Sequence, residues 1–161
     1  MICEPLETIN YEAIILNEAV KNSVIQYNYF YKILYSTNII VLSSIFTIFE
    51  LTNVNVDNES ISFNKTNTNF DVFNKLIALE EYLLKLLNSP KTKMYRFKEI
   101  YDNKTFRFVY NETNEILDNN VNTISTKKNQ FVLKISGLWE SKESIGLTFK
   151  FIIINKYLQF Y

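Results

Sequence analysis

Basic and aromatic side chains gather between residues 91 and 110. The basic residues are Lys91, Lys93, Arg96, Lys98, Lys104 and Arg107, and the aromatic residues that alternate with them are Tyr95, Phe97, Phe106, Phe108 and Tyr110. Proteins that bind single-stranded nucleic acid need cations that follow the phosphates and flat rings on which bases stack. The segment therefore predicts a nucleic-acid-binding β-hairpin with its turn at 101–104.

The same alternation also has a purely structural interpretation. Successive side chains of a strand point to opposite faces, so a half-buried strand pair would hide its rings and leave its charges in water. The solvent exposure of Arg96, Arg107 and the neighbouring rings decides between the two interpretations.

The only tryptophan, Trp139, lies between the only two glycines, Gly137 and Gly146. Glycine permits close approach of another group to the backbone. In one interpretation the indole covers an end of the sheet and its N–H bonds to a loop carbonyl. In the other it stacks on a base, flanked by Lys134 and Lys150. Trp139 and Lys150 therefore join the candidate nucleic-acid-binding residues.

The composition argues against an enzyme. There is no histidine, the commonest general base, and both glycines lie in one late segment, so no glycine-rich phosphate loop exists. Cys3 has no histidine to activate it. Glu80 and Glu81 point about 100° apart on a helix and are predicted to be solvated. We predict a protein without catalytic residues, metal or cofactor.

Length and composition favour a single domain over residues 1–161. Aromatic residues make up 16% of the chain, which excludes a disordered protein. One cysteine allows no disulfide framework and suits a reducing compartment. The N-terminus has no basic signal region, and the most apolar stretch, 39–49, is too short to span a membrane. We expect a soluble, intracellular protein without a membrane partner.

The formal net charge of zero hides an asymmetry between the two halves. Residues 1–90 carry 5 basic and 10 acidic side chains, whereas residues 91–161 carry 12 basic and 7 acidic ones. The halves could neutralise each other inside one fold. Alternatively, the basic half presents a surface to a polyanion.

Hydrophobic periodicity predicts the order of the elements. We predict strands at 24–35, 39–51 and 60–64, an amphipathic helix at 71–89, strands at 94–100 and 105–110, a polar loop at 111–130, and a hairpin of 131–139 and 144–154. Residues 1–22 form an N-terminal segment in which 11–20 suit a helical turn or a strand. Asn69 or Asp71 can cap the helix, whose predicted buried face is Phe73, Leu76, Ile77, Leu83, Leu84 and Leu87.

This order predicts a mainly β, α+β fold with one helix. A helix between the third and fourth of five strands is the order of an OB-like β-barrel, here with an added C-terminal hairpin. The alternative is an antiparallel sheet with one helix packed on it.

Three short motifs carry a resemblance to a known group of proteins. They are Phe30-Tyr-Lys-Ile-Leu-Tyr-Ser-Thr37, Ile135-Ser-Gly-Leu-Trp-Glu140 and Ile145-Gly-Leu-Thr-Phe-Lys-Phe151. With them the chain resembles small uncharacterised proteins of large nucleocytoplasmic DNA viruses. The resemblance implies a viral, OB-like protein that binds single-stranded DNA in a virus factory, host cytoplasm or virion. It brings no catalytic residues, and the chain lacks the acidic tail of many viral single-strand binders.

The leading functional hypothesis is thus a non-enzymatic viral nucleic-acid-binding protein. The rival hypothesis is a virion or virus-factory structural protein that contacts copies of itself or other virion proteins. Phosphate contacts make affinity fall steeply with salt, whereas apolar packing does not, so a salt titration separates the two.

Overall fold

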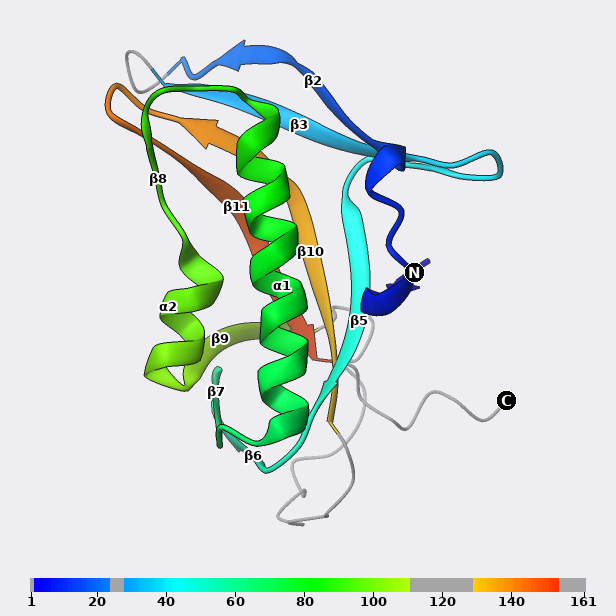
Figure 1. Ribbon diagram of the computed structural model, residues 1–161, viewed down its shortest axis with the longest axis vertical. Coiled ribbons are helices and arrows are strands. Elements are labelled where there is room, and N and C mark those ends of the chain that lie inside the picture. Colours follow the sequence, from blue (N-terminus) through cyan, green and yellow to red (C-terminus); the bar gives the residue numbers. More distant parts are fainter. Residues whose placement is uncertain (1, 24–27, 111–128, 154–161) are drawn as a thin grey trace.

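The computed structural model describes residues 2–23, 28–110 and 129–153, which form a mainly β fold with two helices and an open sheet (Figure 1). The strands are β1 (Glu4–Pro5), β2 (Ile14–Lys21), β3 (Tyr29–Ser36), β4 (Val41–Leu42), β5 (Ile45–Leu51), β6 (Val54–Asp57), β7 (Ser60–Phe63), β8 (Thr92–Lys93), β9 (Thr105–Tyr110), β10 (Asn129–Glu140) and β11 (Ser144–Ile153). The helices are α1 (Asn67–Leu86) and α2 (Arg96–Asn103), and two 3₁₀ turns, Leu6–Thr8 and Tyr11–Ala13, lie near the N-terminus.

The hairpin of β10 and β11 forms the centre of the sheet. β10 pairs with β11 along most of its length, while its other edge is shared between β5 at residues 129–135 and β3 at residues 137–140. The register shifts between Ile135 and Gly137, which marks a β-bulge at the point where the partner changes. The predicted C-terminal hairpin is confirmed within the described residues, but it is central to the sheet and not an addition to it.

The prediction of a closed OB-like barrel is wrong. The sheet runs in the order β1-β5-β10-β11-β9-β7-β6, with β2 and β4 attached to β3, and its end strands do not meet. β1 pairs with β5 in parallel, and β8 and β9 pair with β11 in parallel, whereas the other pairings are antiparallel, so the sheet is mixed. The coarser prediction of an α+β fold with a helix packed on a sheet is confirmed, although there are two helices.

Helix α1 crosses one face of this sheet (Figure 1). It begins four residues earlier than predicted because Thr66 is its cap: the Thr66 Oγ1 accepts the N–H of Asn69 at 3.2 Å. Asn69 itself is fully buried and does not cap the helix. Of the predicted buried face, Phe73, Leu76, Leu83 and Leu84 are buried, and Ile77 and Leu87 are half-buried against the core.

The prediction of a strand at 94–100 is wrong, because residues 96–100 form the first part of α2. Phe97, Ile100 and Tyr101 recur at helical spacing, and Phe97 is fully buried. Lys104 ends the helix in the left-handed conformation, with φ of 57°. The basic and aromatic segment is therefore a short strand, a helix and a strand, and not a hairpin.

The remaining predicted strands are present with shifted bounds. The strand predicted at 24–35 is β3, and residues 24–27 lie outside the described part of the chain. The strand predicted at 39–51 is broken at Ser43 and Ser44 into β4 and β5. The predicted loop 111–130 lies outside the described residues, except that Asn129 and Gln130 begin β10. In the described part of the chain, no helix is both long and apolar enough to cross a membrane.

Candidate nucleic-acid interface

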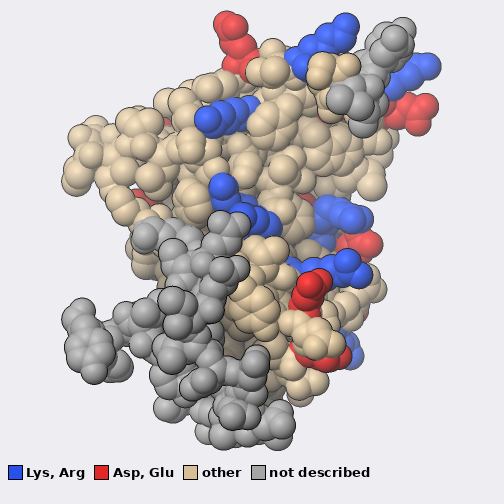
Figure 2. Space-filling model, turned by 180° about the vertical axis from the view of Figure 1, so that it is seen from behind, with Lys and Arg blue, Asp and Glu red and all other residues tan. Residues whose placement is uncertain are grey.

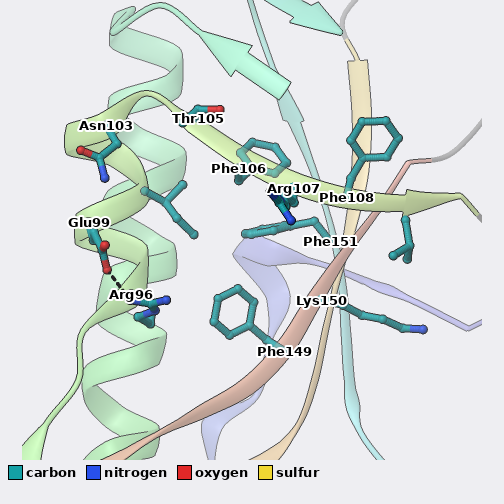
Figure 3. A pocket seen from close by; sticks show the side chains of 12 residues that line it. Arg96, Glu99, Asn103, Thr105, Phe106, Arg107, Phe108, Phe149, Lys150 and Phe151 are labelled. Carbon is teal, nitrogen blue, oxygen red and sulfur yellow. Dashed lines mark hydrogen bonds and ion pairs between the residues drawn. The ribbon is translucent and has the colours of Figure 1, made fainter. Parts of the chain in front are cut away.

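A groove of about 410 Å³ lies between α2, β9 and β11. Arg96 comes from the first turn of α2, Arg107 from β9 and Lys150 from β11. The ring of Phe149 lies on the α2 side of β11, whereas the side chain of Lys150 points away from it (Figure 3). Two of these basic residues come from the predicted binding segment, and the third was predicted from the tryptophan-containing hairpin. The fold thus brings three of the predicted cations to one groove.

A buried carboxylate positions Arg96 by fixing the start of α2. The backbone N–H groups of Arg96 and Phe97 donate to the two carboxylate oxygens of Glu80 at 2.8 and 3.0 Å. Glu80 lies on α1 and is fully buried, so the prediction that it is a solvated surface charge is wrong. Burial raises the pKa of Glu80, although the two backbone hydrogen bonds act in the opposite direction. Glu80 supplies the cap that Tyr95, at the N-cap position, does not provide.

The three cations of the groove differ in their partners. Arg96 forms an exposed ion pair with Glu99, its Nη1 lying 2.7 Å from the carboxylate oxygen (Figure 3). Arg107 and Lys150 form no ion pair with any residue that the structure describes. Because two charges around the groove are not neutralised by neighbours, the groove favours an anionic ligand.

In strand β9, aromatic and basic residues alternate as they do in a half-buried strand, with the rings inside and the charges in water. Phe106 and Phe108 are buried, whereas Arg107 and Val109 are exposed. With Phe97, also buried, they belong to the core, where the rings of Phe106 and Phe151 lie 4.4 Å apart. These three predicted stacking rings present no free face to a ligand.

Other rings remain accessible. Tyr95 is 40% exposed and Tyr110 is 54% exposed, but neither lines the groove. The half-buried Phe149 does line it, and the prediction missed this residue. Its place on the helix-facing side of β11 could have been predicted, because Phe149 continues the row of Ile145 and Leu147 in an alternating strand.

The other predicted cations do not join the groove. Lys91 forms an ion pair with Glu140 at 2.9 Å and donates to the backbone oxygen of Ser141 at 2.7 Å, which ties it to the β10–β11 turn. Hydrogen bonds from Tyr31 and Lys91 hold the pKa of Glu140 below its ordinary value. Lys93 is half-buried in β8. Lys98 and Lys104 are exposed on α2 and at its end, outside the groove.

Trp139 lies on a different surface, the face of the sheet opposite α1. It is half-buried and pairs with Phe30 on one side and Gly146 on the other. No hydrogen bond joins its indole N–H to another described residue, so the expected bond to a loop carbonyl is absent there. Figure 2 shows this face: basic side chains are scattered over a mostly uncharged surface, and acidic ones lie beside several of them.

Comparison of the chain with protein-family models, curated proteins and solved structures finds no match. The resemblance to viral proteins stays a prediction.

Proposed function

We propose that this protein binds single-stranded nucleic acid through the groove between α2, β9 and β11, without catalysing a reaction. One observation carries the proposal: Arg107, Lys150 and the half-buried Phe149 line the same groove, and neither cation is ion-paired to a described residue. This combination of cations and a ring is what a single strand requires of its binding surface.

Each groove residue has a specific role in this proposal. Arg107 and Lys150 contact phosphates, and Phe149 packs against one base. Arg96 adds a third phosphate contact by exchanging Glu99 for a phosphate. This exchange costs little, since an exposed ion pair contributes only about 0–1 kcal/mol to stability. The groove volume of about 410 Å³ lies within the range of sites that hold small ligands, so it suits one nucleotide of a longer strand.

The test is a salt titration of binding to a labelled single-stranded oligonucleotide, followed by fluorescence anisotropy. Arg107→Ala plus Lys150→Ala removes two phosphate contacts. The fall of log affinity with log salt then becomes shallower by about 1.4, since each single-strand contact contributes about 0.7 to its steepness. The matched control is Lys21→Ala plus Lys85→Ala, which removes the same charge from exposed sites outside the groove. Equal slopes in the two double variants would contradict the proposal.

The second candidate function is that of a structural protein of a virion or virus factory. It is favoured by Ile39, which is 91% exposed, beside the exposed Val41 in the β3–β4 hairpin. An aliphatic tip of this kind suits a protein contact. Self-association that is insensitive to salt, together with no oligonucleotide binding at low salt, would support this candidate over the first.

A further inference from the structure

Gly146 makes room for the ring of Trp139. A Cβ atom at position 146 would lie 2.5 Å from Cζ2 and 2.6 Å from Cε2 of the indole. No side chain tolerates such distances, so only glycine lets the six-membered and five-membered rings approach this part of β11 so closely. Because Trp139 and Gly146 are direct cross-strand partners, the indole covers the backbone of its neighbouring strand.

Gly137 makes room for a second ring. A Cβ atom there would lie 2.5 Å from Cζ of Phe30 and 2.3 Å from the backbone oxygen of Tyr31. The only two glycines of the chain therefore each hold an aromatic ring against the sheet. A ring that covers a strand backbone with one face directs its other face away from the sheet.

The two rings are neighbours in one row across the sheet. The register pairs Val20 with Phe30, Phe30 with Trp139, and Trp139 with Gly146, so the row crosses β2, β3, β10 and β11. Both helices lie on the opposite face of the sheet (Figure 1). Phe30 and Trp139 are half-buried, and Val20 at the end of the row is 64% exposed.

Lysines lie beside these rings on the same face. Lys32 pairs with Gly137 and is exposed, and it forms no ion pair with a described residue. Lys150 and Lys134 form a cross-strand pair further along β10 and β11. Lys150 also lines the groove, so this face and the groove adjoin at one residue. Positive charge beside ring faces is complementary to a strand of phosphates and bases.

We propose that Phe30 and Trp139 form a platform on which unpaired bases of single-stranded DNA or RNA stack, with Lys32 contacting the phosphates. The proposal rests on the proposed function, because the strand that crosses the platform continues past Lys150 into the groove. The two glycines are then part of the binding site, since they let the rings lie against the strands.

The sole tryptophan makes the platform directly observable. Stacking of a base on the indole quenches its fluorescence, and no other residue contributes a tryptophan signal. We expect an oligothymidylate to quench the emission of the wild type, and an abasic strand of the same length to bind without quenching it. Trp139→Leu lowers affinity for the oligothymidylate about five- to hundredfold and leaves affinity for the abasic strand unchanged.

Phe30→Leu tests the second ring, and Phe70→Leu is its matched control, because Phe70 is 49% exposed on α1. Only the first variant weakens binding to the oligothymidylate. Binding by the wild type with no quenching, and with equal affinity for the abasic strand, would overturn the platform and leave the groove standing. No binding of either strand at low salt would end both proposals. The quenching measurement uses the wild type alone, so it decides the question even where a variant fails to fold.

Discussion

Buried polar side chains of this protein connect elements that are distant in the sequence. The amide of Asn69 accepts the N–H of Thr52 at 2.8 Å and donates to the backbone oxygens of Thr52 and Asn64, each at 2.8 Å. Within the described residues, no buried side-chain nitrogen or oxygen lacks a hydrogen-bond partner. Such residues fix the loops around α1 because an unpartnered group would cost about 1–3 kcal/mol.

Glu80 gives a prediction for the pH dependence of stability. Its pKa is raised above the ordinary 4.5, mainly by burial and also by Glu81, while the bonds from Arg96 and Phe97 and the charge of Arg96 lower it. The folded protein thus holds this proton more tightly than the unfolded chain. Glu80 therefore makes its whole contribution to the free energy of unfolding below pH 4.5. This contribution decreases as the pH rises through the pKa that Glu80 has in the folded protein.

Urea denaturation of the wild type and of Glu80→Gln at several pH values measures this contribution. As the pH rises from 4.5 through the folded pKa of Glu80, the free energy of unfolding of the wild type should fall relative to that of the variant. Glu81→Gln is the control, because Glu81 is exposed on the same helix. A wild-type advantage over Glu80→Gln that grows with pH would contradict the assigned direction.

At the scale of elements, local patterns predicted some segments and failed at others for identifiable reasons. The β10–β11 hairpin and α1 have long, consistent periods, and both are present. Residues 95–98 alternate like a strand, yet the spacing of Phe97, Ile100 and Tyr101 is helical, and packing on α1 selects the helix. The cap from Glu80 comes from α1, so no local pattern in 94–100 could have indicated it.

The packing of helix α1 on the sheet predicts how much stability is lost when a buried leucine is truncated. Leu83 is fully buried against the sheet, so Leu83→Ala should lower the free energy of unfolding by about 2–5 kcal/mol through lost transfer energy and the resulting cavity. Leu86→Ala makes the same chemical change one turn later, where the side chain is 36% exposed, and should have a much smaller effect. Chemical denaturation followed by circular dichroism compares the two, and equal losses would show that burial is not the cause.

At the scale of the whole molecule, the candidate site depends on contacts between distant segments that could not be predicted from the sequence. Arg96 and Arg107 were predicted to share one surface, and they do, but through a helix and a strand. Lys150 and Phe149 join them because β9 pairs with β11 in parallel. The bulge near Gly137 lets β10 pair with both β5 and β3, which places Phe30 beside Trp139. These long-range pairings, and not composition, bring rings and cations together.

The two proposed surfaces predict how affinity depends on strand length. Gly146 and Lys150 are four residues apart on β11, or about 13 Å at the usual rise of a strand. A strand of about three nucleotides then occupies the groove or the platform, whereas one of about twelve, within the usual range of site sizes, reaches both. Because linked contacts reinforce each other through effective concentration, wild-type affinity should rise steeply between these lengths.

Trp139→Leu should reduce this rise, since the longer strand then gains little beyond the groove. Competition of unlabelled strands against a labelled oligonucleotide measures the rise for both proteins under identical salt. Phe70→Leu, altered on α1, should keep the wild-type dependence. If affinity depends on length in Trp139→Leu as it does in the wild type, the strand does not pass from the groove to the platform. Only a strand held at both surfaces loses the extra affinity of its greater length when one of the surfaces is removed.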